Sequence, residues 1–186
     1  MPEQGERLIS NKIESEPKMY SVAFNRYPWS FSDDKQVINP DVVAQAEAEG
    51  DSCLPGAIGN WWTRICLESK IEFSPKQLED LDYAAYCLIE VARNAFEKVG
   101  HGEIKVIFER GRVIATISDE GHGFEDPKQQ MPFNHGLDHV KKYADEFIIE
   151  TNGKRFTKIK NEPELAETRD TDIQQGSKIT FIKNFE

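Results

Sequence analysis

A carboxylate and an amide share one face of a predicted helix in the middle of the chain. Glu90 and Asn94 stand four residues apart, in a stretch where apolar residues recur at helical spacing. At about 100° per residue, this spacing puts the two side chains one above the other. A carboxylate can act as a general base, and an amide oxygen can bind a divalent cation. The pair is therefore a candidate site of catalysis, and an ordinary solvated helix face is the alternative.

The surroundings of Glu90 bear on that alternative. Tyr83 and Cys87 lie on the same side of the helix as Glu90, which indicates that this side is partly covered. Arg93 and Lys98 do not stand at positions that clearly neutralise Glu90. We therefore expect a covered carboxylate without a cation that clearly neutralises it.

A glycine-rich acidic loop follows a predicted strand. Asp119 comes at the strand end, and Gly121 and Gly123 follow with one residue between them. Such glycines permit positive φ angles and let the backbone pass close to a ligand. A carboxylate beside them can accept a hydrogen bond from an exocyclic amine. The alternatives are an acidic turn and a calcium loop, but the ligand spacing does not follow the usual twelve-residue calcium pattern.

Two further motifs have simpler explanations. His135 and His139 have the spacing of zinc ligands on a helix, but no cysteine or third ligand stands nearby. Trp61 and Trp62 would suit either a partner surface or the core, and we expect at least one of them in the core.

Four segments, taken in order, resemble the ATP-binding boxes of the histidine-kinase-like ATPase superfamily, which has the Bergerat fold and includes histidine kinases and gyrase. They are residues 90–95, 119–124, 135–137 and 176–180. Within the superfamily, the phrases LIEVARNAFEKV, ISDEGHGFED and GLDHVKKYADEF are most similar to bacterial anti-sigma-factor serine/threonine protein kinases. The resemblance covers roughly residues 52–183.

The resemblance implies a role for each matching residue. Asn94 would coordinate Mg²⁺, and Glu90 would act as general base or orient the attacking hydroxyl. Asp119 would bind the adenine amine, and Gly121 and Gly123 would let the loop wrap the nucleotide. The other expected ATP-binding residues are Lys98, placed at a phosphate or on the surface, Gly136 and Leu137 at the start of a phosphate-facing helix, and Thr180 near the adenine.

The resemblance also implies a function. It points to a cytoplasmic kinase, dependent on ATP and Mg²⁺, that phosphorylates or sequesters a protein partner, either a sigma factor or an anti-anti-sigma-like antagonist, with a homodimer as one assembly. Two departures favour another outcome. Asn134 stands where the family has a glycine, and only the twelve residues 124–135 lie between Gly123 and Gly136, which makes the ATP lid short. The alternatives are a nucleotide-gated partner switch with little or no kinase activity and a stand-alone histidine-kinase-like ATPase domain.

The elements that must position these residues are predicted from periodicity. Ser74, Pro75 and Gln77 form a capping-box start for a helix that runs to about Val99 and stops at Gly100. Further helices are predicted at 54–67 and 136–144, and strands at 103–109, 113–118, 147–151, 156–160 and around 179–181, with an exposed loop at 161–175. This order predicts an α+β two-layer sandwich, with helices on one face of a mixed, mainly antiparallel sheet.

The long helix should turn a single apolar face to the core. That face consists of Leu78, Leu81, Ala85, Leu88, Ala92, Phe96 and Val99. Residues 51–186 are predicted to form the ATPase domain. Residues 1–50 are predicted to form a partly flexible extension, with some strand and a short helix within 21–50.

Composition excludes several classes of function. The chain has 33 acidic and 23 basic residues and a net charge of -10, which disfavours nucleic-acid binding. No apolar run approaches the length of about 18 residues that a membrane-spanning helix needs, and the N-terminal residues do not form a secretion signal. The three cysteines are expected to be buried thiols in a reducing cytosol.

Overall fold

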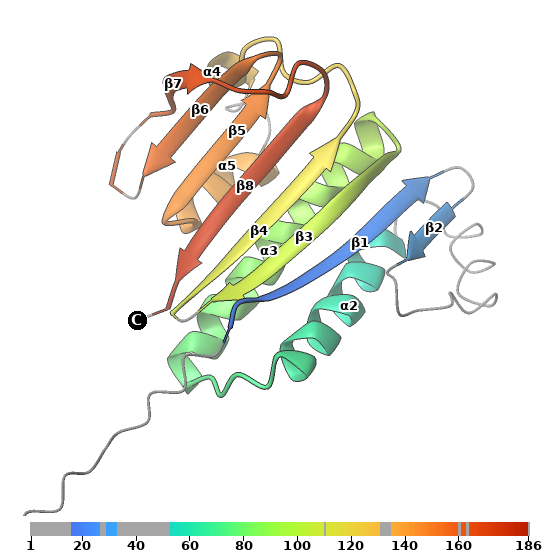
Figure 1. The fold of residues 1–186 in the computed structure, drawn as a ribbon, viewed down its shortest axis with the longest axis vertical. Coiled ribbons are helices and arrows are strands. Elements are labelled where there is room, and N and C mark those ends of the chain that lie inside the picture. Colours follow the sequence, from blue (N-terminus) through green and yellow to red (C-terminus); the bar gives the residue numbers. More distant parts are fainter. Residues whose placement is uncertain are drawn as a thin grey trace, which may run out of the picture.

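An eight-stranded sheet with helices on one face makes up the body of the structure, a computed structural model (Figure 1). It describes residues 16–26, 29–32, 53–109, 111–130, 135–159, 161–162 and 164–185. The strands lie in the order β2-β1-β3-β4-β8-β5-β6-β7, and every pairing between neighbours is antiparallel. Their bounds are β1 Lys18–Arg26, β2 Trp29–Ser32, β3 His101–Glu109, β4 Arg112–Asp119, β5 Glu146–Thr151, β6 Lys154–Ile159, β7 Ala166–Asp170 and β8 Ser177–Asn184.

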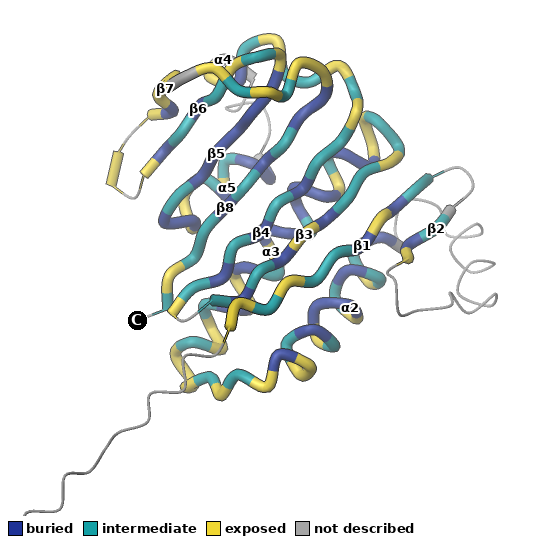
Figure 2. Tube along the Cα trace, viewed as in Figure 1, coloured by how far each residue is buried: buried dark blue, intermediate teal, exposed yellow. Residues whose placement is uncertain are grey.

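The helices α2 (Cys53–Ser69), α3 (Pro75–Lys98) and α5 (His135–Tyr143) cover the same face of this sheet (Figure 1). A fourth, short helix is α4 (Pro127–Gln130). The strands alternate accordingly. On β3, Ile104, Val106 and Phe108 point into the core, whereas Lys105 between them is exposed. β4 and β8 show the same alternation (Figure 2). No described helix covers the opposite face. The α+β class with a mainly antiparallel sheet is therefore confirmed.

The helix α3 begins where its capping box predicts. The Ser74 hydroxyl accepts a hydrogen bond from the Gln77 backbone N–H, and the Gln77 side chain accepts one from the Ser74 N–H. At the other end the chain turns at Gly100, whose φ is +89°. Leu78, assigned to the core face, is instead 51% exposed. Cys87, assigned to the Glu90 side, is buried.

The packing of α3 on two sides explains the burial of Cys87. The sheet and α2 cover one side of α3, and α5 packs on another, over Cys87 and Glu90. Leu78 lies in the first turn of the helix and lines a pocket together with residues of α2, such as Trp62 and Leu67. The partial cover predicted for the Glu90 side is therefore present.

The boundary predicted at residue 50 is corrected by the sheet. β1 pairs with β3 along its whole length from Lys18 to Asn25, so this segment belongs to the same domain as the rest of the sheet. The reason is its alternation, which buries Val22 and Phe24 against the helices. Within 21–50, the described residues 21–26 and 29–32 are strands. The short helix that was expected in this segment lies outside the described residues.

The loop predicted at 161–175 also needs correction. Residues Ala166–Asp170 form the edge strand β7, which pairs with β6. Its charged residues mask the strand pattern in the sequence, because an edge strand needs few apolar side chains and commonly carries charge. Within the described part of the chain, no helix has the length and apolar character needed to cross a membrane.

Candidate functional site: a cavity between α3, α5 and the ends of β4 and β8

A cavity of about 920 Å³ lies between α3, the first turn of α5 and the ends of β4 and β8. It brings together six residues that were predicted from separate parts of the sequence, namely Asn94, Lys98, Asp119, Gly121, Gly123 and Gly136. Side chains that were not predicted complete the wall, chiefly Arg93, Val99, Phe124, Ser177 and Ile179. The cavity therefore has an apolar part, a carboxylate and several cationic or amide groups.

Asp119 is fixed in this cavity by two hydrogen bonds. Its Oδ1 accepts one from the Gly121 backbone N–H at 2.9 Å, and its Oδ2 accepts a short one from the Ser177 hydroxyl. Asp119 and Ser177 face each other in the register of β4 and β8, so the sheet itself sets their separation. A carboxylate held in this way is a preorganised acceptor for a ligand donor.

The loop after Asp119 is tied to two other parts of the chain. The Phe124 N–H donates to Thr151 Oγ1 at 2.9 Å, and that hydroxyl donates to the Gly176 carbonyl at 3.0 Å. Gly123 has φ +70°, and a Cβ atom there would collide with the same Thr151 hydroxyl. The glycine is therefore required both by the backbone conformation and by the close approach of β5.

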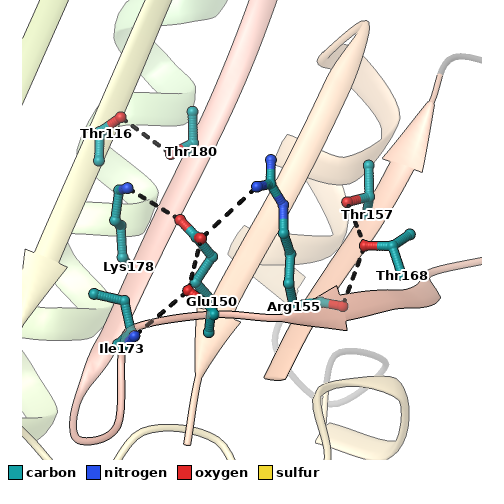
Figure 3. Close-up of polar contacts among 9 residues, drawn as sticks. Thr116, Glu150, Arg155, Thr157, Thr168, Ile173, Lys178 and Thr180 are labelled. Carbon is teal, nitrogen blue, oxygen red and sulfur yellow. Dashed lines mark hydrogen bonds and ion pairs between the residues drawn. The ribbon is translucent and has the colours of Figure 1, made fainter. Parts of the chain in front are cut away.

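The connection from β7 to β8 leads into the site, and a polar network on the uncovered face of the sheet holds it in place (Figure 3). Glu150 Oε1 accepts a hydrogen bond from the Thr171 hydroxyl at 2.8 Å, and Glu150 Oε2 pairs with Lys178 Nζ at 3.0 Å. The Arg155 guanidinium lies 3.9 Å from the same carboxylate. Thr171 in turn accepts from the Ile173 N–H, so the network fixes the segment that leads into Gly176 and Ser177.

These contacts lower the pKa of Glu150. Burial alone would raise its pKa, but the hydrogen bonds from Lys178 and Thr171, together with the charges of Lys178 and Arg155, hold the pKa below its usual value. Glu150 is therefore more stable as a carboxylate in the folded protein than in the unfolded chain.

Glu90 is covered, as expected, but it is also paired. Its Oε2 accepts a hydrogen bond from Arg93 Nη2 at 2.7 Å, at i,i+3 spacing on α3. The expectation that Arg93 does not neutralise Glu90 is therefore wrong. The same oxygen lies against Gly136, where a Cβ atom would collide with it. Glu90 itself is not part of the cavity wall.

Asn94 and Lys98 reach the cavity from the same helix. The Asn94 amide nitrogen donates to the Glu90 carbonyl oxygen at 2.8 Å, so the amide oxygen is the atom suited to bind a cation. The Lys98 ammonium lies 6.0 Å from the centre of the Phe124 ring, at the cavity edge. Lys98 is exposed on the surface, as one of the two predicted positions has it, and it also lines the cavity.

Two predicted ATP-binding residues lie elsewhere. Leu137 is fully buried in the core under α5 and does not line the cavity. Thr180 points to the uncovered face of the sheet, where its hydroxyl lies 3.0 Å from that of Thr116 (Figure 3). Side chains alternate along a strand, so Ser177 and Ile179 face the cavity and Thr180 cannot. Ser177, not Thr180, is the hydroxyl of β8 at this site.

Other chemistries have little support at these positions. Burial raises the pKa of both the Cys66 and Cys87 thiols to about 12, so neither supplies a thiolate nucleophile near neutral pH. His139 stacks on Tyr143, and the described residues contain no group of three or more His, Cys, Asp or Glu side chains that could hold a metal ion. Trp61 and Trp62 are both buried, as expected for core residues.

Part of the predicted ATP lid lies outside the described residues. This part is 131–134 and includes Asn134. No protein-family model matches the chain, and no curated protein sequence matches it either.

We expect Gly123→Ala to destabilise the protein more than the same change at another left-handed glycine. Gly111 has φ +77°, but a methyl group added there would meet open space, so Gly111→Ala should cost only about 1–2 kcal/mol for the backbone conformation. Gly123→Ala should add about 1–3 kcal/mol of overpacking against Thr151 and Gly176. Urea unfolding measures both free energies. Equal losses in the two variants would show that the loop is not locked against β5.

The Glu150 network should make the stability of the protein depend on pH. A depressed pKa in the folded state stabilises the protein above the unfolded-state pKa of about 4.3, and this stabilisation is lost as the pH falls through the folded-state value. Glu150→Gln should therefore cost on the order of 1–2 kcal/mol at pH 7, and the difference from wild type should shrink as the pH falls towards about 3.

The matched control is Glu103→Gln, because Glu103 pairs with Lys105 at 2.9 Å but both side chains are well exposed. Its loss should stay within about 0.5 kcal/mol at every pH. Urea unfolding across the pH series measures all three proteins. A difference between wild type and Glu150→Gln that does not change with pH would contradict the assignment.

Proposed function

We propose that the cavity binds Mg-ATP and that the chain is an ATP-binding regulatory protein with the Bergerat fold of the histidine-kinase-like ATPase superfamily. The observation that carries this proposal is the carboxylate of Asp119. It is held at the end of β4 by Gly121 and Ser177, inside a cavity that also contains Asn94 and the start of α5. Each of the four sequence boxes contributes at least one residue to the wall of this cavity, which supports the proposal.

The Asp119 end of the cavity suits an adenine base. Ile117, Ile179 and Val99 supply apolar walls on which a flat ring can pack. Both Asp119 oxygens already accept hydrogen bonds from the protein, and a carboxylate has further lone pairs for the exocyclic amine. Guanine carries a carbonyl oxygen at the corresponding position, which a carboxylate would repel. The site should therefore select adenine.

The part of the cavity at the first turn of α5 suits phosphates. Gly136 lies in this turn, whose amide groups favour anions, and Lys98 offers a cationic group in the cavity wall. Asn94 would hold Mg²⁺ through its amide oxygen, with phosphate oxygens and water as the other ligands. Mg²⁺ is commonly held by only one or two protein groups together with the substrate. A single amide oxygen in the cavity therefore fits this ion. The bound ion would spread the negative charge of the phosphates.

We further propose that the reaction is phosphorylation of a serine or threonine on a partner protein. The partner hydroxyl would attack the terminal phosphorus, its new P–O bond forming as the bond to the bridging oxygen of ADP breaks. Glu90 would accept the hydroxyl proton. By the same resemblance, the partner would be a sigma factor or an anti-anti-sigma-like antagonist, and the protein would act in the cytoplasm.

A second candidate function is a nucleotide-gated partner switch with little or no kinase activity. The observation that favours it is the Glu90 carboxylate, which pairs with Arg93 at 2.7 Å and packs against Gly136 outside the cavity wall. A carboxylate in this position does not face a nucleophile. ATP would then set the position of α3 and α5, and the partner would respond to that position.

Asp119→Asn should abolish ATP recognition. Asparagine presents an N–H group where the carboxylate accepts, so one polar group at the site loses its partner, and affinity should fall roughly a hundredfold or more. The control is Asp126→Asn, since Asp126 lies in the same loop and accepts a hydrogen bond from the Lys128 N–H at 2.9 Å but does not line the cavity. Calorimetry with Mg-ATP measures both variants. Equal wild-type affinities for ATP and GTP would contradict the assignment of Asp119.

Glu90→Gln separates the two candidate functions. Loss of a general base should lower phosphotransfer by roughly a hundredfold or more, while the ATP affinity stays within a few-fold because the base contacts the nucleophile. Glu79→Gln, an exposed glutamate on the same helix, should leave both unchanged. The assay follows labelled phosphate into proteins encoded by neighbouring genes.

Each result of this assay has a distinct meaning. Full transfer by Glu90→Gln would show that the base is misassigned. A wild type that binds ATP and its partner but transfers no phosphate would reject the kinase and leave the switch.

A further inference from the structure

Arg93 contacts both the candidate base and the cavity. Its Nη2 lies 2.7 Å from Glu90 Oε2, and its Nε lies 3.7 Å from Glu97 Oε1. The Arg93 side chain is 45% exposed and forms part of the cavity wall, whereas the Glu90 side chain is only 9% exposed and does not. The guanidinium is therefore the charged group through which events in the cavity can reach Glu90.

The position of Arg93 along α3 matches one end of the proposed ligand. Val99 packs against Gly121, next to Asp119, and so marks the adenine end of the cavity. Arg93 precedes Val99 by six residues, about 9 Å along the helix axis. It stands in the same turn as Asn94, on the side of the first turn of α5, where the phosphates would lie. The terminal phosphate is the part of ATP that extends farthest from the adenine.

We infer that Arg93 senses the terminal phosphate of ATP and, in doing so, releases Glu90. This inference rests on the proposed binding of ATP in the cavity. Without a terminal phosphate, Arg93 stays on Glu90 and the carboxylate cannot accept a proton. With ATP bound, the guanidinium turns to the terminal phosphate, and Glu90 becomes available to a nucleophile. Arg93 is thus a specificity residue for the triphosphate and a positioning residue for Glu90.

The physical chemistry of the three groups favours this exchange. A terminal phosphate carries more negative charge than a single carboxylate and offers two oxygens to the planar guanidinium fork. Because Arg93 is half exposed, it can change partner without leaving a packed core. Lys98 is a compact point charge seated beside the Phe124 ring, so it can attract any phosphate but does not touch Glu90 within the described contacts.

The experiment compares the affinities for Mg-ATP and Mg-ADP in four proteins by calorimetry. They are the wild type, Arg93→Met, Arg93→Lys and Arg112→Met. Arg112 is a matched control, because it pairs with Glu109 at 2.6 Å with the same i,i+3 separation and is 43% exposed, but it lies in the β3–β4 hairpin. Circular dichroism checks that each variant is folded.

The expected result is a change in selectivity. Arg93→Met should weaken ATP binding by roughly tenfold to a hundredfold, the usual effect of losing a hydrogen bond to a charged group, while ADP affinity changes less than about threefold. Arg93→Lys should restore part of the ATP affinity, since it keeps the charge but not the fork. Arg112→Met should bind both nucleotides like the wild type.

Three results would overturn the inference, and they differ from a failure of the proposed function. Equal losses of ATP and ADP affinity in Arg93→Met would show a merely structural role. Unchanged affinities for both nucleotides would show that Arg93 does not meet the terminal phosphate, and the same loss in Arg112→Met would reduce the effect to net charge. A wild type that binds neither nucleotide would instead reject ATP binding itself, and the inference with it.

Discussion

The hydrogen bond between Asp119 and Ser177 is the interaction on which the geometry of the site depends. It joins the end of β4 to the beginning of β8, two strands that are adjacent in the sheet but distant in sequence. Thr151 on β5 stands opposite Ser177 on its other side, so three strands end in one row of polar side chains. Each group in this row holds a loop as well as a strand. The position of the acceptor is thereby fixed by backbone pairing and not by loop packing alone.

The same row explains why the uncovered face of the sheet matters to a cavity on the covered face. Ser177 follows directly on the segment that Thr171 and Glu150 hold in place. Glu150 lies on the uncovered face, as do Lys178 and Thr180, because neighbouring residues of a strand point in opposite directions. Loss of the Glu150 carboxylate on acidification would loosen the chain that leads into Ser177. Stability and site geometry are therefore linked through one connection between strands.

The sequence predicts the local parts of this structure well, and the non-local parts poorly. The capping box of α3 and the positive φ angle in the loop after Asp119 are read from neighbouring residues, and the structure has the capping box at Ser74 and the positive φ at Gly123. β1 was not assigned to the domain, because its partner β3 is far along the chain and only pairing reveals it. Thr180 was placed at the cavity and Ser177 was missed, because a shift by an odd number of residues along a strand moves a side chain to the other face. The rule of alternation along a strand was available from the sequence and would have selected Ser177 and Ile179.

The ion pair of Glu90 shows a limit of a different kind. Spacing alone permits Arg93 to reach Glu90, but it equally permits Arg93 to reach Glu97, and the structure has both contacts. Burial determines which of the two carboxylates needs the cation. Once α5 covers Glu90, its charge must be compensated, because an unpaired buried carboxylate is costly, whereas Glu97 remains half exposed and needs no partner. If Glu90 is the base that we propose, it would begin the reaction paired with a cation, and proton acceptance would require a second anion that draws Arg93 away. A ligand that brings its own negative charge to the neighbouring cavity meets that requirement, and a neutral ligand does not.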